Sequence, residues 1–216
     1  IITDDCSKDN TIEICEQWLL THKERFFKTQ IIISRINTGI PANCNRGYNA
    51  SSGEWIKAIA GDDCLYPNAL EKYISTAINY KASLLFSSID IYIKNFNPIN
   101  KVNSHISPPI LFKSNRATAK EQFEMLTFGN QIFAPAVIMK KNLYQNVNKY
   151  DENIKLCEDW PMWLKLTRYG YKFHYINEPL VKYRQYNDST WGKQSIGKQY
   201  VVINGENLIK NKSGVV

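Results

Sequence analysis

Two adjacent carboxylates, Asp62 and Asp63, follow a short apolar run that starts at Glu54. The run is too short for a helix and lies between Gly53 and Gly61, which is typical of a buried strand. Open α/β sheets bind their ligands at the carboxyl ends of such strands. Because neighbouring side chains point in different directions, one carboxylate can contact an organic group while the other binds a hard cation such as Mg²⁺ or Mn²⁺. The pair therefore predicts a ligand site at this strand end.

Two more acidic pairs have types and positions that suit the same chemistry. Asp4 and Asp5 follow a strand end at residues 1–3, and Glu158 and Asp159 begin a helix. The first pair can equally form a solvated turn, and the second can simply be the acidic residues favoured in a first helical turn. The helix dipole would lower the pKa of Asp159 whereas burial would raise it, so the residues alone leave its direction open.

The elements that would position these carboxylates alternate between strand and helix. Apolar and β-branched runs predict strands at residues 1–3, 31–33, 54–60, 84–93, 132–139 and 171–176. Helices are expected after residue 9, around 43–47, from 67, at 118–128 and from 158. This alternation is typical of an α/β fold with a mixed, mainly parallel sheet and helices on both faces.

Two of the predicted helices carry an apolar stripe at helical spacing. The first stripe consists of Ile12, Cys15, Trp18 and Leu19. The second consists of Leu70, Tyr73, Ile74, Ala77 and Ile78. Residues 94–115 are instead rich in Asn, Ser and Pro, which predicts a long loop that is either a functional lid or irregular.

Composition limits the class of protein and its partners. The chain has 216 residues, of which 44% are apolar, enough to bury the core of one domain. Its net charge of +7 favours an anionic partner, namely nucleic acid, a phosphorylated small molecule or an anionic membrane surface. Five cysteines without a C-x-x-C pair suggest neither a disulfide framework nor a thiolate zinc site, and a reducing cytoplasm is the simplest location. The chain contains no apolar run of about eighteen residues, so the sequence predicts no membrane span.

The three acidic pairs belong to a longer series of short motifs. In chain order these occupy residues 4–11, 37–39, 45–47, 53–56, 61–63, 130–135, 150–152, 158–160 and 180–184. In this order and spacing the chain resembles the family 2 glycosyltransferases of the GT-A, or Rossmann-like, fold. The resemblance covers residues 1–190 as one glycosyltransferase domain, and it leaves 191–216 as a C-terminal tail or an extra helix.

The resemblance implies a nucleotide-diphosphate sugar donor, such as a UDP-sugar, and transfer with inversion at the anomeric carbon. It implies that Asp5 binds the donor base and Asp62 the ribose. Asp63 looks like the direct ligand of Mn²⁺ or Mg²⁺, and Asp159 like the general base. A cation stabilises the charge that develops on the leaving diphosphate, and a carboxylate on the opposite face of the sugar can deprotonate the acceptor hydroxyl.

Further substrate contacts follow from the same resemblance. The residues concerned are Asn45, Arg46, Glu158, Trp160 and Arg184. Each has a simpler interpretation beside it. Arg46 is either a surface charge or a contact with donor phosphate, and Trp160 is either a core residue or a platform for a sugar ring. Arg184 can also be a strand residue whose charged group extends to solvent.

Several positions depart from the family pattern. The first strand and helix of the fold have no counterpart, so we expect them upstream of Ile1. Cys44 stands where the family usually has Arg, Ala60 replaces the first acidic residue of the D-x-D-D form, and Tyr186 stands where many members have His. These departures leave an alternative function open, a non-catalytic nucleotide-sugar-binding module.

The acceptor expected from the resemblance is a saccharide or a lipid-linked oligosaccharide, in the synthesis of a cell-surface polysaccharide such as O-antigen or capsule. A lipid-linked acceptor would bring a cytoplasmic enzyme to the inner face of the cell membrane, and the basic net charge agrees with peripheral contact with anionic lipid. Nucleic acid is a weaker expectation, because Lys and Arg are spread along the chain without a recognition motif.

Overall fold

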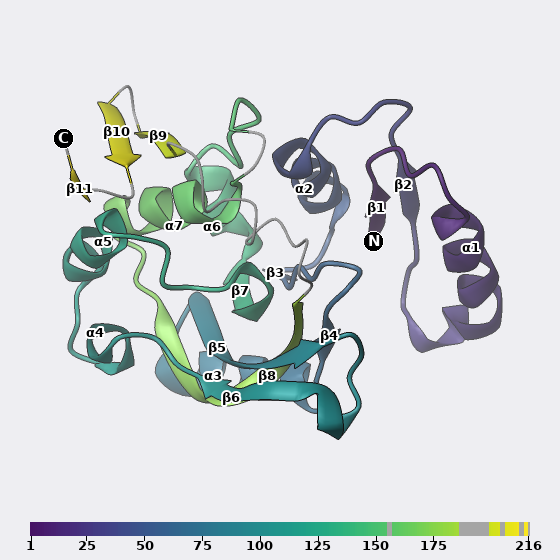
Figure 1. The fold of residues 1–216 in the computed structure, drawn as a ribbon, viewed down its shortest axis with the longest axis horizontal. Coiled ribbons are helices and arrows are strands. Elements are labelled where there is room, and N and C mark those ends of the chain that lie inside the picture. The colour runs from purple at the N-terminus through teal and green to yellow at the C-terminus, as the bar shows by residue number, and fades with distance from the viewer. Residues whose placement is uncertain (155–156, 186–198, 204–205, 212–213, 216) are drawn as a thin grey trace.

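The computed structural model describes residues 1–154, 157–185, 199–203, 206–211 and 214–215 (Figure 1). Its strands are β1 (Ile2–Asp4), β2 (Ile31–Ile33), β3 (Trp55–Ile56), β4 (Cys64–Leu65), β5 (Leu84–Ile93), β6 (Lys101–Ile106), β7 (Val137–Lys140), β8 (His174–Gln185), β9 (Gln199–Ile203), β10 (Glu206–Asn211) and β11 (Gly214–Val215). Its α-helices are α1 (Thr11–His22), α2 (Ile40–Ala50), α3 (Ala69–Tyr80), α4 (Ile110–Lys113), α5 (Ala119–Thr127), α6 (Lys141–Asn146) and α7 (Asp159–Arg168). Short 3-10 turns are η1 (Lys23–Arg25), η2 (Pro98–Asn100) and η3 (Ala134–Ala136).

A mixed six-stranded sheet forms the centre of the molecule. Its order is β3-β7-β5-β8-β4, and β6 pairs with β5 outside that path. The pair β5–β8 is parallel, and the other pairs in this sheet are antiparallel. A separate parallel pair, β1–β2, carries the start of the chain. The predicted α/β class and mixed sheet are confirmed, although antiparallel pairing within the central sheet is more frequent than the alternation of elements suggested.

Most of the predicted elements are present, and several differ in length. Strand β2 and strand β5 have the predicted bounds. The strand expected at 54–60 is reduced to β3, because β3 lies at the sheet edge and pairs only with β7 among the described residues. The strand expected at 132–139 begins later, as β7, because η3 precedes it, and the last predicted strand begins at His174 and runs further, as β8.

The predicted long loop at 94–115 is wrong in part. It contains η2, β6 and α4. Strand β6 is held to β5 by Asp90, whose buried carboxylate accepts a hydrogen bond of 2.6 Å from Lys101 Nζ and one of 2.8 Å from His105 N. The polar composition of the segment concealed this strand, which pairs antiparallel with β5 in an irregular register.

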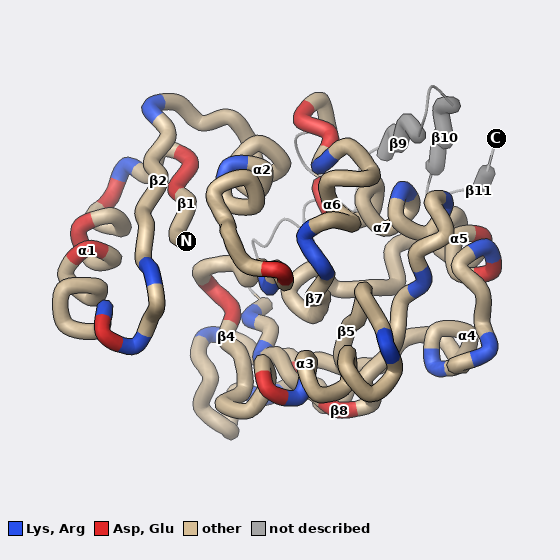
Figure 2. The backbone as a smooth tube through the Cα atoms, turned by 180° about the vertical axis from the view of Figure 1, so that it is seen from behind, with Lys and Arg blue, Asp and Glu red and all other residues tan. Residues whose placement is uncertain are grey.

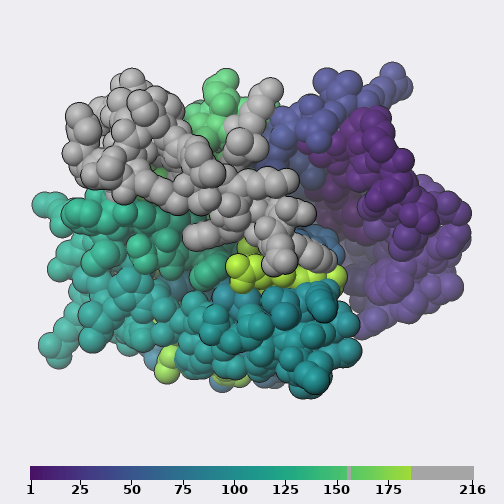
Figure 3. Space-filling model, viewed as in Figure 1, coloured from purple at the N-terminus to yellow at the C-terminus, as the bar shows by residue number. Residues whose placement is uncertain are grey.

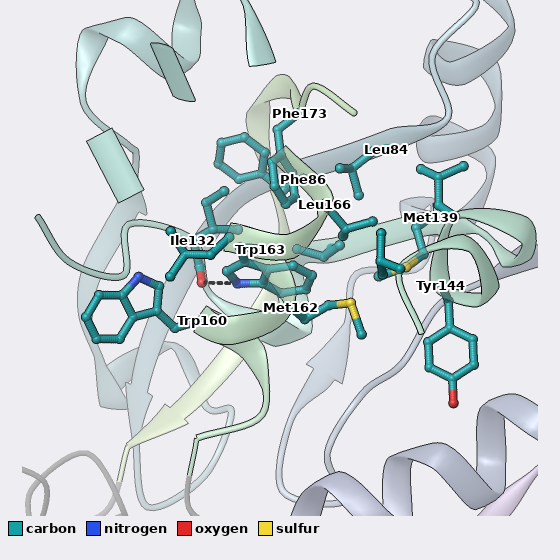
Figure 4. Close-up of a cluster of buried hydrophobic side chains, with 14 of the residues drawn as sticks. Leu84, Phe86, Ile132, Met139, Tyr144, Trp160, Met162, Trp163, Leu166 and Phe173 are labelled. Carbon is teal, nitrogen blue, oxygen red and sulfur yellow. Dashed lines mark hydrogen bonds between the residues drawn. The ribbon is translucent and has the colours of Figure 1, made fainter. Parts of the chain in front are cut away.

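The large core cluster lies between the central sheet and helices α5 and α7. Strand β5 contributes Leu84 and Phe86, and α7 contributes Trp163 and Leu166 (Figure 4). Trp163 is almost fully buried, and its Nε1 donates a hydrogen bond to the Ile132 carbonyl at 3.2 Å. This cluster fixes the start of α7 relative to the sheet, and therefore fixes the position of Asp159.

Helix α3 buries part of the predicted stripe, namely Tyr73 and Ala77, while Ile74 is partly buried against the same cluster. Ala69, Tyr73 and Ala77 face the sheet, whereas Leu70 and Ile78 are exposed. The buried residues are spaced four apart and share one face of the helix, and the exposed Leu70 and Ile78 lie on the adjacent face. The predicted stripe therefore spanned two neighbouring faces of α3.

The N-terminal unit, comprising β1, α1 and β2, lies at one end of the molecule (Figures 1 and 3). Helix α1 has no buried residue, and Trp18 of its predicted apolar stripe is exposed. Helix α2 joins this unit to the rest: Asn43 Nδ2 donates to the Thr3 carbonyl at 3.2 Å, and a Cβ added at Gly47 would lie 3.1 Å from Thr3 Cγ2. None of the helices within the described ranges is long and apolar enough to cross a bilayer.

Candidate active site

The carboxylate of Asp5 lies just after β1 and organises the turn before α2. It accepts hydrogen bonds from Thr38 N at 2.9 Å, Thr38 Oγ1 at 2.7 Å and Gly39 N at 2.7 Å. Arg46 Nη2 adds an ion pair at 2.6 Å. Burial alone would raise the pKa of Asp5, but the hydrogen bonds from Thr38, Arg46 and Gly39 together hold it below its ordinary value. Asp5 is therefore kept ionised by four donors of the protein.

The neighbouring residues of α2 have different surroundings. Besides Asp5, the Arg46 guanidinium contacts Thr38 Oγ1 at 2.8 Å and Asn43 Oδ1 at 3.0 Å. Asn45 is buried, and its Nδ2 donates to the Tyr150 carbonyl at 3.0 Å and to Glu152 at 2.7 Å.

The amide oxygen of Asn45 is equally occupied. It accepts a hydrogen bond from Tyr144 at 2.7 Å and one from Tyr150 N at 3.1 Å. With two donors and two acceptors paired within the protein, the Asn45 amide has reached its hydrogen-bonding capacity. This arrangement favours a positioning role for Asn45 over the direct substrate contact expected from the sequence.

Asp62 and Asp63 lie between β3 and β4, in the turn that leads into β4. Asp62 is exposed, whereas Asp63 is partly buried and its Oδ1 accepts a hydrogen bond of 2.9 Å from Arg184 N. Burial raises the pKa of Asp63 to about 6, opposed by that hydrogen bond. The predicted site residue Arg184 therefore reaches Asp63 through its main chain, while its guanidinium lies over the ring of Phe96 at 4.5 Å.

The ammonium group of Lys57 is a further charge close to Asp63. Its Nζ donates hydrogen bonds to the carbonyls of Ala58, at 2.8 Å, and Pro135. Burial lowers the pKa of Lys57 to about 7, and the negative charge of Asp63 opposes that shift. The sequence did not single out Lys57, because its position within an apolar run gave no sign that its ammonium turns toward the interior.

Glu158 and Asp159 stand at the start of α7 and share a partly buried position. Asp159 Oδ1 accepts a hydrogen bond from Trp160 N at 2.7 Å, and Asp159 Oδ2 accepts one from Asn130 Nδ2 at 2.7 Å. Burial raises the pKa of Asp159. Burial and then repulsion from Asp159 raise the pKa of Glu158 to about 7. The question left open by the sequence is thus answered, since burial outweighs the helix dipole.

The hydroxyl of Tyr183, on β8, connects the acidic pairs. Its pKa is raised to about 12, first by burial and then by the negative charges of Asp63, Asp62 and Asp159. The three carboxylates therefore lie within electrostatic reach of one hydroxyl. Sequence reasoning had considered Tyr183 only as part of a strand, and its neighbour Arg184 was the only signal for it.

Cys44 connects the same region to α2. Its pKa is raised to about 12 by burial and then by the charges of Glu158 and Asp159, while Arg46 opposes that rise. Helix α2 thus lies within electrostatic reach of the start of α7.

The indole of Trp160 belongs to the core. It is buried in the large core cluster, and its Nε1 donates a hydrogen bond of 2.8 Å to the Leu126 carbonyl (Figure 4). The core interpretation of Trp160 therefore describes this structure better than the sugar platform. Tyr186, where the family often has His, lies outside the described residues, as does the segment 191–198 of the predicted tail.

The residues present can hold a divalent cation in one particular way. Among the described residues, no three His, Cys, Asp or Glu side chains form a group that could enclose a metal ion. Mg²⁺ is commonly bound by one or two carboxylates together with substrate phosphates and water. No hydrogen bond from a described residue reaches Oδ2 of Asp63, so that oxygen fits such a site, which a diphosphate would complete.

Comparisons with known proteins place this geometry in context. The model of Glycosyl transferase family 2 matches residues 1–140. An uncharacterized glycosyltransferase of Methanocaldococcus jannaschii is 26% identical over 185 residues, which cover 85% of this chain and 59% of that protein. TuaG of Bacillus subtilis, named a teichuronic acid biosynthesis glycosyltransferase, is 22% identical over 189 residues, covering 88% of this chain and 68% of that protein. The chain spans about three fifths of the length of the first of these relatives.

Solved structures show the same architecture. TarS residues 1–349 of S. aureus, in complex with UDP-GlcNAc, matches with a TM-score of 0.66 at 15% identity, covering 91% of this chain and 52% of that chain. The complex of TarS 1–349 with UDP matches with a TM-score of 0.62 at 17% identity, covering 86% of this chain and 50% of that chain. This likeness confirms the predicted GT-A fold.

Proposed function

The chain belongs to glycosyl transferase family 2, and from that premise we propose that it transfers a sugar from a nucleotide-diphosphate sugar to an acceptor hydroxyl with inversion at the anomeric carbon. The observation that supports this proposal best is that Asp62, Asp63 and Asp159, from two separate acidic pairs, all lie within electrostatic reach of the Tyr183 hydroxyl. In this proposal Asp62 and Asp63 lie on the side of the nucleotide-sugar donor, and Asp159 lies on the side of the acceptor hydroxyl that attacks the sugar. In-line displacement by one base inverts the reacting carbon.

Asp63 would hold Mn²⁺ or Mg²⁺ on the donor side. The bound cation would neutralise charge that develops on the diphosphate as it leaves. Asp62, which is exposed beside it, is proposed to contact the ribose. Asp5 is proposed to contact the base, and Arg46, which Asp5 orients, the donor phosphate.

Asp159 would remove the proton from the acceptor hydroxyl. A general base works best when its pKa approaches the working pH, and burial moves the pKa of Asp159 in that direction. Glu158, with a pKa of about 7, lies beside it and is proposed to bind the acceptor in its protonated form at or below neutral pH.

The proposed donor is a UDP-sugar, because the two TarS complexes hold UDP and UDP-GlcNAc in the same fold. The proposed acceptor is a saccharide or lipid-linked saccharide of a cell-surface polysaccharide, as the name of the relative TuaG suggests for that protein. We place the reaction in the cytoplasm, with peripheral contact at the anionic inner face of the membrane. Lys and Arg occur on most elements rather than on one (Figure 2), so contact with lipid would involve several of them.

A non-catalytic nucleotide-sugar-binding module is the second candidate. The observation in its favour is the saturated state of Asp5, whose carboxylate is already paired with Arg46, Thr38 and Gly39. Thermal-shift measurements with UDP-sugars, with and without Mn²⁺, test the binding that both candidates share, because a ligand that binds the native state raises its melting temperature. Sugar transfer or metal-dependent hydrolysis of the UDP-sugar would separate them, since a pure binder gives neither.

Replacement of the proposed cation ligand tests the donor side. We expect Asp63→Ala to weaken Mn²⁺-dependent binding of a UDP-sugar about 100-fold, the effect of losing a few kcal/mol of cation-mediated attraction. Calorimetry with and without Mn²⁺ measures this affinity. Asp9→Ala removes an exposed carboxylate that bonds only Thr11 and should leave the affinity unchanged. Metal-dependent affinity that is equal in Asp63→Ala and the parent would exclude Asp63 as the ligand.

A further inference from the structure

We propose that Asn130 is a positioning residue for the base: its side-chain amide holds the Asp159 carboxylate in place and keeps it ionisable at neutral pH. The proposal rests on the function proposed above and adds a residue to it. Asn130 lies in the segment between α5 and η3, far from α7 in the sequence. It was noted in the sequence only as the first residue of a motif at 130–135.

The orientation of the Asn130 amide is fixed by two hydrogen bonds. Its Oδ1 accepts from Ile132 N at 3.1 Å, and its Nδ2 donates to Asp159 Oδ2 at 2.7 Å. An amide NH₂ group cannot accept a hydrogen bond from a main-chain N–H, so Ile132 N requires the amide oxygen on its side and directs the NH₂ group to Asp159. The contact therefore does not depend on a free choice between the two amide orientations.

Both ends of the segment around Asn130 are anchored to α7. Trp160 Nε1 donates to the Leu126 carbonyl at 2.8 Å, and Trp163 Nε1 donates to the Ile132 carbonyl at 3.2 Å. Leu126 and Ile132 are themselves buried. The two indoles thus fix the chain before and after Asn130 on the helix that carries the base. A donor held this rigidly can set the direction of a carboxylate without losing much freedom on binding.

The remaining contacts of Asp159 are few. Oδ1 accepts from Trp160 N, and Cys157 Sγ lies 3.8 Å from the same oxygen. The charged or titratable groups within electrostatic reach are Glu158, Cys157, Cys44 and Tyr183. None of these is a cation. The Cys157 thiol favours the ionised form of Asp159 weakly, through its long hydrogen bond, and the other groups favour the protonated form or are neutral. Asn130 is the side chain that most strongly favours the ionised form against burial.

The energetic consequence has a definite direction. A hydrogen bond to the charged form of an acid lowers its pKa, so loss of Asn130 raises the pKa of Asp159 further. The base then needs a higher pH to be ionised. A residue with a merely structural role would lower the rate by the same factor at every pH, whereas a residue that tunes the base moves the acid limb of the pH–rate profile.

Asn130→Ala tests both parts of this role. We expect kcat at pH 7 to fall roughly 10- to 100-fold, as for a misplaced catalytic group, with the acid limb of the kcat profile about one pH unit higher. UDP-sugar affinity should stay within about twofold, since the donor side is intact. Asn146→Ala is the matched control, because exposed Asn146 also donates one side-chain hydrogen bond, to Tyr171 at 2.7 Å, away from the site.

A second measurement does not require activity. Carboxyl-detected ¹³C NMR gives the pKa of Asp159 directly, with Asp159→Asn to assign its signal. A higher pKa in Asn130→Ala supports the inference, and an unchanged pKa overturns it, even if the rate falls. If the parent transfers no sugar but the pKa still moves, the proposed function fails while the positioning contact stands.

If Asn130→Ala does not fold, Asn130→Asp provides the same test, because it preserves the size of the side chain. The added carboxylate would raise the pKa of Asp159 more than alanine does, because like charges disfavour each other. Asn130→Asp should therefore move the acid limb further than Asn130→Ala. A profile at the parental position in a folded Asn130→Asp variant would overturn the inference.

Discussion

Asp5 and Asp159, for which we propose roles on opposite sides of one site, are held in opposite ways. Asp5 accepts hydrogen bonds from two side chains and two main-chain N–H groups, including the ion pair with Arg46, and its pKa is lowered. Asp159 has one side-chain N–H donor, Asn130, and its pKa is raised because burial dominates. A carboxylate that is fully paired contributes to structure, whereas one that is buried and under-paired keeps its basicity for chemistry.

The same contrast extends to the parts of the fold that carry them. Asp5 follows β1, in a unit whose helix α1 has no buried residue. Asp159 begins α7, in which seven residues are buried. Hydrogen bonds and an ion pair hold the Asp5 carboxylate, whereas the core holds the start of α7 that carries Asp159. We therefore expect substitution of Asp5 to affect mainly stability, and substitution of Asp159 to affect mainly the rate of transfer. The predictions below test that difference, from the largest expected effect to the smallest.

The largest effect should come from Asp159→Asn. The amide of the new Asn side chain cannot take up the proton of the acceptor hydroxyl. We therefore expect the rate of transfer to fall by about 10²- to 10⁴-fold, the usual contribution of a general base. Donor and cation affinity should remain nearly parental in calorimetry. Asp9→Asn, at an exposed position, serves as the control. Transfer at the parental rate would show that the base lies elsewhere.

Asp5→Asn should give an intermediate effect, on stability rather than chemistry. Loss of the ion pair and of charge-assisted hydrogen bonds should lower the free energy of unfolding by about 1–3 kcal/mol at pH 7. Because the folded pKa of Asp5 lies below its ordinary value of 3.8, this contribution is present above that pH and disappears as pH falls through the folded pKa.

Chemical denaturation at several pH values checks this prediction for Asp5. The difference between parent and variant should shrink in strong acid. A variant of parental stability that has lost transfer as completely as Asp159→Asn would break the comparison and make Asp5 a chemical residue.

The smallest effect is expected for Glu158→Gln, and its sign is stabilising. The pKa of Glu158 rises from 4.5 to about 7 on folding, so ionisation destabilises the fold as pH rises through that window. Removal of the charge should add about 1 kcal/mol of stability at pH 8, after allowance for partial solvent screening. This corresponds to a melting temperature about 2–4 °C higher at pH 8, and to no difference at pH 4. Equal melting temperatures at pH 8 would contradict it.

The sequence predicted the fold where local patterns were strong. The β-branched run at 31–33 and the alternating run at 84–93 became β2 and β5 with the predicted bounds. The helix predicted at 118–128 is α5, whose start is stabilised by a capping box of Thr118 and Glu121. Strand β6 was missed because its sequence is polar and does not alternate clearly, and its pairing with β5 and its contacts with Asp90 appear only in the fold.

The candidate site was predictable in its acidic residues and not in their partners. The order and spacing of the short motifs marked Asp62, Asp63 and Asp159, because each acidic pair alone also fits a turn or a first helical turn. Asn130 donates a hydrogen bond to Asp159, and Tyr183 lies within reach of the charge of Asp159. Both contacts exist only in the folded chain. Contacts between residues tens of positions apart leave no periodic trace in one sequence, so such partners appear only in three dimensions.

Asn45 illustrates how strongly this site depends on distant parts of the chain. Its amide binds Tyr150 and Glu152, which lie 105 and 107 residues away. Closing a loop of that length costs about 4 kcal/mol beyond a constant, and the contact forms only after the chain has reached residue 152. During synthesis on the ribosome, helix α2 must therefore wait for residue 152 to emerge before the Asn45 amide finds these partners. We expect this contact to form late in folding, so that the nucleotide side of the site is completed only once the acceptor side exists.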